Sequence, residues 1–129
     1  MSEKTVLIID DDTLLCWVLE RRLSLMGVNA VSASTGDEGL NKVRQQTYDL
    51  IFVDINLPDI NGLELLDKIQ ELSLHSKLIV ITAETNEDYR RDAINKGAFD
   101  FIEKPFGFSE IKKVVNSIFS DCMGEDPGL

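Results

Sequence analysis

The sequence is short of cysteine, proline, histidine, tryptophan and positive charge. Among 129 residues there are two cysteines, three prolines, one histidine and one tryptophan, and 13 basic residues stand against 23 acidic ones. Cys16 and Cys122 lie far apart, without a CxxC pair or a nearby histidine, so we expect reduced thiols and no disulfide framework. The net charge of −10 argues against binding of nucleic acid or of an anionic membrane, because both need cationic patches.

Long apolar runs are also missing. No stretch approaches the roughly 20 residues that cross a bilayer, and the start MSEKTVLIID lacks the basic region and cleavage site of a signal peptide. We therefore expect a cytoplasmic protein. The length and the hydrophobic content of 43% are those of one soluble globular domain. Its acidity suits binding of cations or basic partners, although most such charge is simply solvated surface.

Short, β-branched apolar runs alternate with segments of helical period. The runs are VLII (6–9), VNAVSA (28–33), YDLIFVD (48–54), KLIVITA (77–83) and AFDFIE (98–103). The helical stripes are Leu15, Val18, Leu19 and Leu23; Leu40 and Val43; Leu63, Leu66 and Ile69; Tyr89, Ala93 and Ile94; and Ile111, Val114, Val115 and Ile118. We expect Leu15, Val18 and Leu19 to face the sheet. Near-continuous apolar strands and right-handed crossovers predict an α/β fold, a doubly wound five-stranded parallel sheet with five flanking helices.

Start and stop signals mark the helices. Capping residues stand before several helical segments, and glycines stand after two of them. The signals are Thr35 with Glu38, Asn61 with Glu64, Asp12 as an N-cap, and the glycines Gly27 and Gly97. The segment 122–129 is too poor in apolar residues to pack, so we expect a folded domain over 1–121 followed by a flexible tail or linker stub.

Polar residues follow four of the five strands. Asp10 and Asp11 follow the first strand, Asp54 ends the third, Thr82 lies at the end of the fourth, and Lys104 follows the fifth. Each has an ordinary explanation as a loop, strand-end or surface residue. In a doubly wound sheet, however, ligands bind at the carboxyl ends of the strands, where these five residues meet. Together they predict a functional site.

The chemistry of these residues suits a magnesium-dependent phosphoryl acceptor. Mg²⁺ prefers oxygen ligands, so the carboxylates can hold it, and the metal offsets their mutual repulsion. Asp54 would be the nucleophile that forms an aspartyl phosphate. Lys104 and Thr82 would bind the phosphoryl oxygens. Pro105 is a candidate for a cis peptide that orients Lys104, and Asp12 is expected mainly to cap a helix.

Several motifs together resemble the receiver domain of two-component response regulators. They are IIDDD (8–12), FVDINLPDINGLELL (52–66), VITA (80–83) and FDFIEKPF (99–106), and the resemblance spans residues 4 to about 119. It implies a flavodoxin-like domain with strand order 2-1-3-4-5. It also implies transfer of a phosphoryl group from a sensor histidine kinase, or a phosphotransfer protein, to Asp54, with Mg²⁺ or in its place Mn²⁺. Such a domain catalyses its own phosphorylation and dephosphorylation and is not a turnover enzyme.

The resemblance implies a role for each site residue. Asp11 would ligate the metal directly and Asp10 largely through water, while Asp54 and the backbone carbonyl of Asn56 would complete the protein ligands. Asn56 and Glu84 would flank the attacking water and tune hydrolysis of the phosphoryl group.

A conformational switch is implied as well. Thr82 would move toward the phosphoryl group, and the aromatic residue of the fifth strand, here Phe101, would follow. Phe101 departs from the frequent tyrosine and has no hydroxyl group to donate. It could equally be an ordinary packed strand residue.

Partners follow from the same comparison. Leu14 and Trp17 should point away from the sheet near the acidic mouth, where they could dock a kinase; alternatively, Trp17 packs against a neighbouring helix. The output would be a partner protein or an effector domain bound through the fourth helix, fifth strand and fifth helix. A homodimer formed on phosphorylation is a further expectation.

The sequence fits three other functions less well. A haloacid-dehalogenase-type phosphatase usually has a second aspartate two residues after the nucleophile, where this chain has Asn56. A flavodoxin needs a phosphate-binding loop that Asp10 to Asp12 would repel. A degenerate receiver that acts only as an interaction module is disfavoured because all five expected residue types are present.

Overall fold

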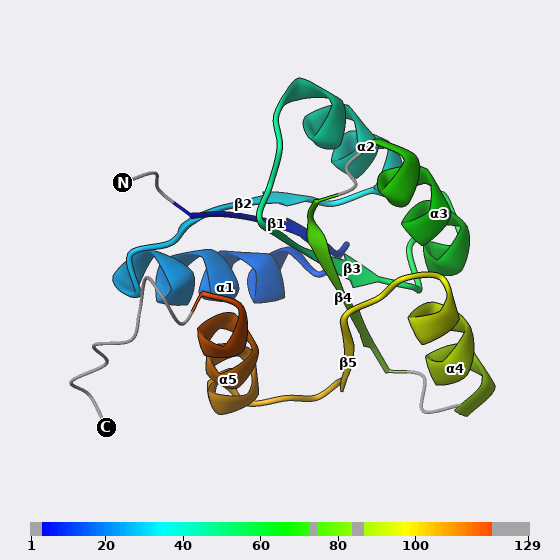
Figure 1. Ribbon diagram of the computed structural model, residues 1–129. Helices are drawn as coiled ribbons and strands as arrows, with labels where there is room; N and C mark the ends of the chain where they lie inside the picture. Colours follow the sequence, from blue (N-terminus) through cyan, green and yellow to red (C-terminus); the bar gives the residue numbers. More distant parts are fainter. Residues whose placement is uncertain (1–3, 73–74, 84–86, 120–129) are drawn as a thin grey trace.

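The computed structural model describes residues 4–72, 75–83 and 87–119, in which five strands alternate with five helices (Figure 1). The strands are β1 (Thr5–Ile9), β2 (Asn29–Ala33), β3 (Leu50–Asp54), β4 (Lys77–Thr82) and β5 (Asp100–Glu103). The helices are α1 (Thr13–Leu25), α2 (Gly36–Gln45), α3 (Gly62–Leu72), α4 (Glu87–Asn95) and α5 (Phe108–Ile118). The predicted end of the domain and the tail over 122–129 lie outside the described residues.

The sheet is parallel throughout and has the order β2-β1-β3-β4-β5. Helices α1 and α5 cover one face, and α2, α3 and α4 cover the other (Figure 1). The chain is therefore a doubly wound α/β domain of flavodoxin-like architecture, as predicted. Among the described residues, no helix is long and apolar enough to cross a membrane.

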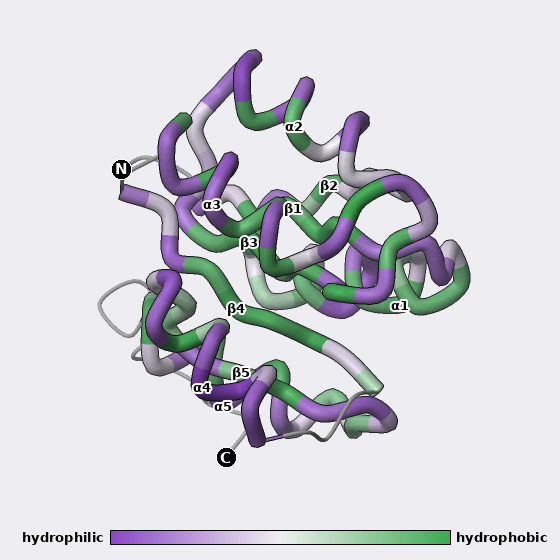
Figure 2. Tube along the Cα trace, turned by 90° about the vertical axis from the view of Figure 1, so that its right-hand side faces the viewer, coloured by the Kyte–Doolittle hydropathy of each residue, from purple (hydrophilic) through white to green (hydrophobic). Residues whose placement is uncertain are grey.

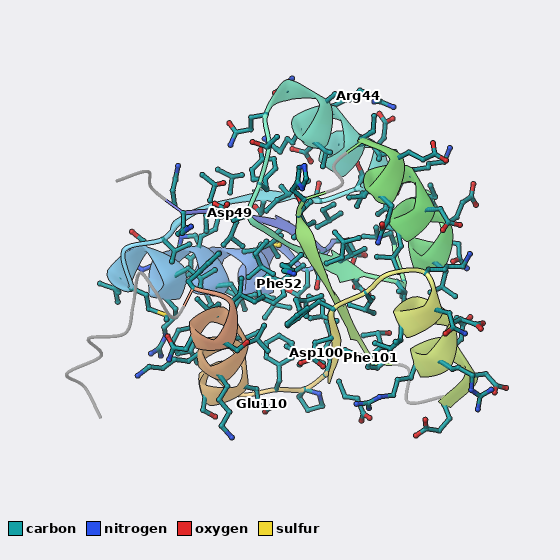
Figure 3. All side chains as sticks on the ribbon, in the orientation of Figure 1. Arg44, Asp49, Phe52, Asp100, Phe101 and Glu110 are labelled. Carbon is teal, nitrogen blue, oxygen red and sulfur yellow. The ribbon has the colours of Figure 1, made fainter. Side chains whose placement is uncertain are left out.

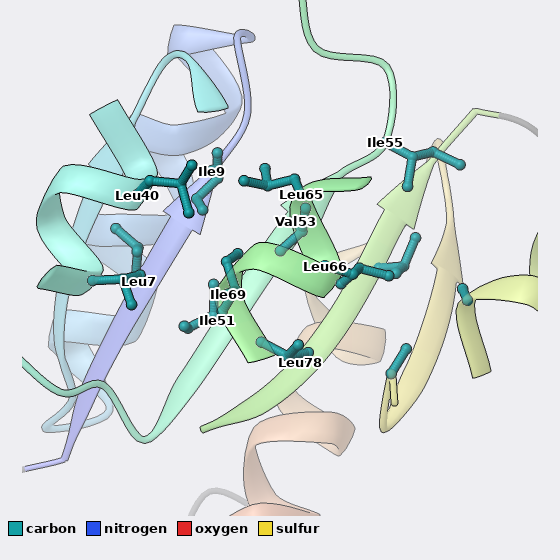
Figure 4. Packing of buried hydrophobic residues seen from close by; sticks show 14 of the residues in the cluster. Leu7, Ile9, Leu40, Ile51, Val53, Ile55, Leu65, Leu66, Ile69 and Leu78 are labelled. Atoms are coloured by element: carbon teal, nitrogen blue, oxygen red, sulfur yellow. The ribbon is translucent and has the colours of Figure 1, made fainter. Parts of the chain in front are cut away.

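Two hydrophobic cores lie on opposite faces of the sheet, because successive strand residues point to opposite sides. Leu7, Ile51 and Val53 pack under α2 and α3 (Figure 4), whereas Ile8 and Phe52 pack under α1 and α5. All five residues of β3 are buried, which explains the unbroken apolar run in the sequence. Figure 2 shows the same contrast, with largely hydrophobic central strands beneath helices that alternate in hydropathy.

The predicted helix starts are confirmed at α1 and α2, with one change in detail. The Asp12 carboxylate caps α1 by accepting a hydrogen bond from the backbone N–H of Leu15 at 3.1 Å. Thr35 caps α2 by accepting from the N–H of Glu38 at 3.1 Å. The Glu38 carboxylate accepts from Ser34, the residue before the cap, at 2.9 Å, so the reciprocal bond reaches one residue further back than a capping box requires.

Asn61 caps α3, but through a different partner from the predicted capping box. Its side chain accepts from the N–H of Leu63 at 2.8 Å, one residue before Glu64. Gly27 and Gly97 have φ angles of 82° and 103°, in the left-handed region that glycine adopts without a steric penalty. They end α1 and α4 as predicted.

Two helix stripes were assigned partly wrongly. The buried face of α1 consists of Cys16, Leu19 and Leu23, whereas Val18 is partly exposed. Val18 lies about 160° around the helix from the buried Cys16 and therefore falls outside the buried face. On α4, Ile94 is likewise half exposed beside the buried Ala93.

Candidate functional site

The parallel sheet brings the predicted site residues to one edge. In the paired register Ile9 lies beside Val53, Asp54 beside Ile81, and Thr82 beside Glu103. The residues that end or follow these strands must therefore be neighbours. The structure does bring together the five residues predicted from the strand ends. The carboxylates of Asp10, Asp11 and Asp54 cluster, Lys104 pairs with two of them, and Thr82 is linked to Asp54 through Asn56.

Three carboxylates form the centre of the site. One oxygen from each of Asp10, Asp11 and Asp54 lies within 4.8 Å of the others. The Asp10 side chain is 0% exposed and Asp54 is 4% exposed, whereas Asp11 is exposed. The Lys104 ammonium lies 2.8 Å from Asp10 Oδ2 and 3.2 Å from Asp54 Oδ2, so one cation serves two buried carboxylates.

Burial sets the electrostatics of the cluster. Removal from water raises the pKa of Asp10 to about 6, and the charge of Asp54 adds to the rise, while Lys104 and the backbone N–H of Asp12 oppose it. Burial lowers the pKa of Lys104, but the Asp10 and Asp54 carboxylates outweigh that effect and raise it. The site therefore favours a bound cation.

The donor set fits a hard divalent cation. Asp10 Oδ2 is buried and, among the described residues, has no hydrogen-bond partner beyond its ion pair with Lys104. Asp11 is exposed at the mouth, where a hydrated ion could be reached. Clustered carboxylate oxygens with an open, wet side suit Mg²⁺, which keeps several of its waters.

Asn56 links the two sides of the site. Its backbone N–H donates to Asp54 Oδ1 at 2.9 Å, and its side-chain Nδ2 donates to the hydroxyl of the buried Thr82 at 3.3 Å. The backbone N–H of Lys104 donates to the Thr82 carbonyl at 2.7 Å. Sequence reasoning assigned Asn56 a backbone carbonyl ligand and a place beside water, and missed this amide bridge. The position of Asn56 just past one strand end, beside the end of the next strand, was the available signal.

The loop after Asp54 is held in a fixed shape. Gly62 N–H donates to the Ile55 carbonyl at 3.1 Å, and a Cβ atom on Gly62 would overlap Ile55 Cα. The Asp59 carboxylate accepts hydrogen bonds from the backbone N–H groups of Gly36 and Asp37, both at 2.9 Å. These bonds lower the pKa of Asp59 and tie the loop to the start of α2. Asp59 was not singled out from the sequence.

Of the remaining predicted residues, Phe101 lies on β5 and Pro105 just after it. Phe101 is 6% exposed and packs in the core beneath α4. The Lys104–Pro105 peptide bond is cis, as predicted. Glu84 lies outside the described residues.

The α1 surface beside the site is apolar. Leu14 is 70% exposed and Trp17 is 57% exposed, which confirms that both point away from the sheet. The Arg21 guanidinium stacks over the Trp17 ring, 5.1 Å from its centroid. Arg21 of the same helix thus covers one face of the Trp17 ring, and the rest of the side chain is accessible.

The fold and the site define a class of protein: a doubly wound α/β domain with an acidic cluster, able to hold a cation, at the carboxyl edge of its sheet. A family model described as the response regulator receiver domain matches residues 6–116. The chain belongs to that family.

Known relatives agree. The chain is 34% identical over 113 residues to the DNA-binding transcriptional regulator NtrC of Klebsiella pneumoniae, covering 88% of this chain and 24% of that protein. A CheY-like receiver domain protein from Methanospirillum hungatei has a TM-score of 0.83 and 31% identity, covering 93% of this chain and 99% of that one. A response regulator from Burkholderia pseudomallei, solved with a phosphorylated aspartic acid and a calcium ion, has a TM-score of 0.83 and 25% identity, covering 96% and 73%. The chain thus spans about a quarter of the NtrC sequences it matches.

Proposed function

We propose that this domain accepts a phosphoryl group on Asp54 from the phosphohistidine of a sensor kinase or a phosphotransfer protein. The observation that carries the proposal is the pairing of a buried Asp54 with Lys104, beside Asp10 and Asp11 at the sheet edge. The phosphorylated aspartic acid in the B. pseudomallei structure supports it, because that relative shares the fold.

The reaction is a direct displacement. A carboxylate oxygen of Asp54 attacks phosphorus, the P–N bond to the histidine breaks, and the imidazole leaves with the electron pair and takes up a proton. The Lys104 ammonium, which pairs with the carboxylates before the reaction, then binds one phosphoryl oxygen. The Thr82 hydroxyl donates a hydrogen bond to another phosphoryl oxygen. Mg²⁺, held by Asp10, Asp11, Asp54 and the carbonyl of Asn56, would supply charge neutralisation when bound, and Mn²⁺ could replace it.

The domain undergoes one phosphorylation and one hydrolysis per cycle and is not a turnover enzyme. Water attacks the phosphorus of the aspartyl phosphate, and the P–O bond to Asp54 breaks. By the family resemblance, Asn56 and Glu84 would orient or restrict that water. Because the Asn56 amide already bonds Thr82, movement of the hydroxyl toward the phosphoryl group would break this bond and also release the amide.

Phosphorylation would change the output surface. Thr82 and Phe101 form the proposed switch, and the face made by α4, β5 and α5 would bind a partner protein, an effector domain or a second copy of this domain. The net charge of −10 supports a protein partner over direct binding of nucleic acid. We place this signalling in the cytoplasm, because sensor kinases phosphorylate their partners there.

The proposed kinase contact is the exposed pair Leu14 and Trp17. Exposed aromatic and aliphatic side chains next to a reactive site are suited to anchor a partner. Trp17→Ala should slow phosphotransfer from the kinase and leave phosphorylation by a small phosphodonor unchanged. Equal losses with both donors would rule out the docking role.

The phosphoryl site is tested by intact mass spectrometry after incubation with Mg²⁺ and acetyl phosphate. We expect one phosphoryl adduct in the wild type and in Asp37→Ala, an exposed carboxylate on α2. The adduct should be absent with a chelator and absent in Asp54→Ala. A wild type that gains no adduct from acetyl phosphate or from a cognate kinase would favour the alternative, an interaction module that acts without phosphorylation.

A further inference from the structure

Phe101 has an aromatic ring in the switch position but no hydroxyl group with which to hold it. Its ring is buried in the core with Val80 and Ala93. Figure 3 labels Phe101 on β5, on the side of the sheet that α4 covers. The guanidinium carbon of Arg90, on α4, lies 5.5 Å from the centroid of this ring. A cation at this distance is attracted to the ring face.

Helix α4 is fixed at its carboxyl end. Lys96, just after the helix, pairs with Asp67 of α3 at 2.9 Å, and its carbonyl accepts from Gln70 Nε2 at 3.1 Å. A Cβ atom on Gly97 would overlap the Gln70 amide, so the turn is packed closely against α3. Arg90 lies about 9 Å along the helix from this anchor, at 1.5 Å per residue. The anchor fixes the position from which Arg90 reaches the ring.

We propose that Arg90 is a positioning residue that holds Phe101 in its buried position and couples α4 to the switch. The inference rests on the proposed function, since it concerns the aromatic residue of that switch. A tyrosine could be held by a hydrogen bond from its hydroxyl, whereas phenylalanine offers only the face of its ring. Arg90 supplies the interaction that a ring without a hydroxyl can still make.

The effect is modest because Arg90 is exposed to solvent. A cation–π contact at an exposed site corresponds to about a two- to five-fold shift in a conformational equilibrium. In this family the aromatic residue moves inward on phosphorylation, so the contact favours the phosphorylated form. By linkage, the affinity for a phosphoryl analogue that selects the buried ring changes by up to the same factor.

Arg91 provides a matched control on the same helix. Its guanidinium pairs with Asp88 at 3.3 Å, and both side chains are exposed. Arg91→Met therefore removes an equal charge without touching the switch. Arg90→Met keeps a flexible apolar stem and removes the guanidinium, and Arg90→Lys keeps a cation.

The test uses the whole chain labelled with 4-fluorophenylalanine, with the Phe101 line among the six phenylalanines assigned from Phe101→Leu. We expect Arg90→Met to shift the Phe101 ¹⁹F line toward its solvent-exposed position and to weaken beryllofluoride binding with Mg²⁺ by up to about five-fold. Arg90→Lys should lie between Arg90→Met and wild type, and Arg91→Met should match wild type. An unchanged line and affinity in Arg90→Met, or an equal change in Arg91→Met, would overturn the proposal.

Failure of the proposed function has a different signature. If the wild type neither gains a phosphoryl group from acetyl phosphate nor binds beryllofluoride, the phosphoryl site is refuted. If all variants are phosphorylated normally and only the Arg90 effects are missing, the site stands and the role of Arg90 is refuted.

Discussion

Replacing Lys104 with methionine should destabilise the metal-free protein strongly, because Lys104 lies between two buried carboxylates. Its ammonium is 2.8 Å from Asp10 and 3.2 Å from Asp54. Methionine fills a similar volume but carries no charge. The variant is left with two carboxylates facing each other out of contact with water.

Two estimates give the size of the loss in the free energy of unfolding. Removing one partner of a buried ion pair costs about 3–5 kcal/mol. The variant can instead protonate Asp10, whose pKa burial has already raised to about 6. At pH 7 this protonation costs about 1.4 kcal/mol, to which the loss of the Lys104–Asp54 pairing is added. The Lys104 side chain is 22% exposed, so water already weakens the pairing. We therefore expect the free energy of unfolding to fall by about 2–4 kcal/mol.

Urea denaturation at pH 7 with a chelator measures this loss. Lys96→Met is the control, since its pair with Asp67 is exposed and should contribute less than about 1 kcal/mol. Added Mg²⁺ should stabilise the Lys104 variant more than wild type, because it restores the missing positive charge. A loss below about 1 kcal/mol for Lys104→Met, or equal stabilisation of both proteins by Mg²⁺, would contradict the assigned role of this lysine.

Two substitutions and one labelling experiment test the surrounding structure. Gly62→Ala, whose added methyl group would overlap Ile55, should lower the free energy of unfolding by about 1–3 kcal/mol and slow phosphorylation. The control Gly107→Ala places its methyl group 3.9 Å from Ser109 Oγ and should cost only the loss of a glycine N-cap, less than about 1 kcal/mol in urea denaturation; no effect of Gly62→Ala on stability would refute the close packing. Asp59→Asn should cost about 1 kcal/mol at pH 7. Because backbone hydrogen bonds lower the pKa of Asp59, its contribution is lost as the pH falls below about 4, and a pH-independent difference in urea denaturation would contradict the assignment. Burial raises the pKa of the Cys16 thiol to about 12, so peptide mapping should show no alkylation of native Cys16 by iodoacetamide at pH 8, and rapid labelling would show that the helix opens.

The fold was predictable because its strands are short, nearly continuous apolar runs. Strands buried on both faces must be apolar at nearly every position, and β3 meets this condition over its full length. The site was predictable for a related reason: residues that follow parallel strands share one edge. Asp10, Asp54, Thr82 and Lys104 needed no side-chain detail to be brought together.

The missed features all depend on side-chain directions. The amide of Asn56 reaches Thr82, and the carboxylate of Asp59 reaches a helix 22 positions or more earlier in the chain. The stack of Arg90 on Phe101 joins two elements whose spacing is set by packing on α3. Polar residues of this kind have no periodicity in sequence, so only the assembled structure reveals their partners. Val18 was misassigned for a simpler reason, because a hydrophobic residue at the border of a helix face satisfies the pattern without being buried.

Because the site is built from residues at the ends of several strands, it forms only late in folding. The lysine that pairs with Asp54 is 50 positions away in the chain and is reached only after β5 has joined the sheet. Contacts of such high sequence separation form late, because much of the chain must be ordered before they close. A nascent or truncated chain would carry the aspartates without a completed pocket. The fraction of molecules that can be phosphorylated should then equal the fraction that is fully folded, which makes phosphorylation a measure of folding yield.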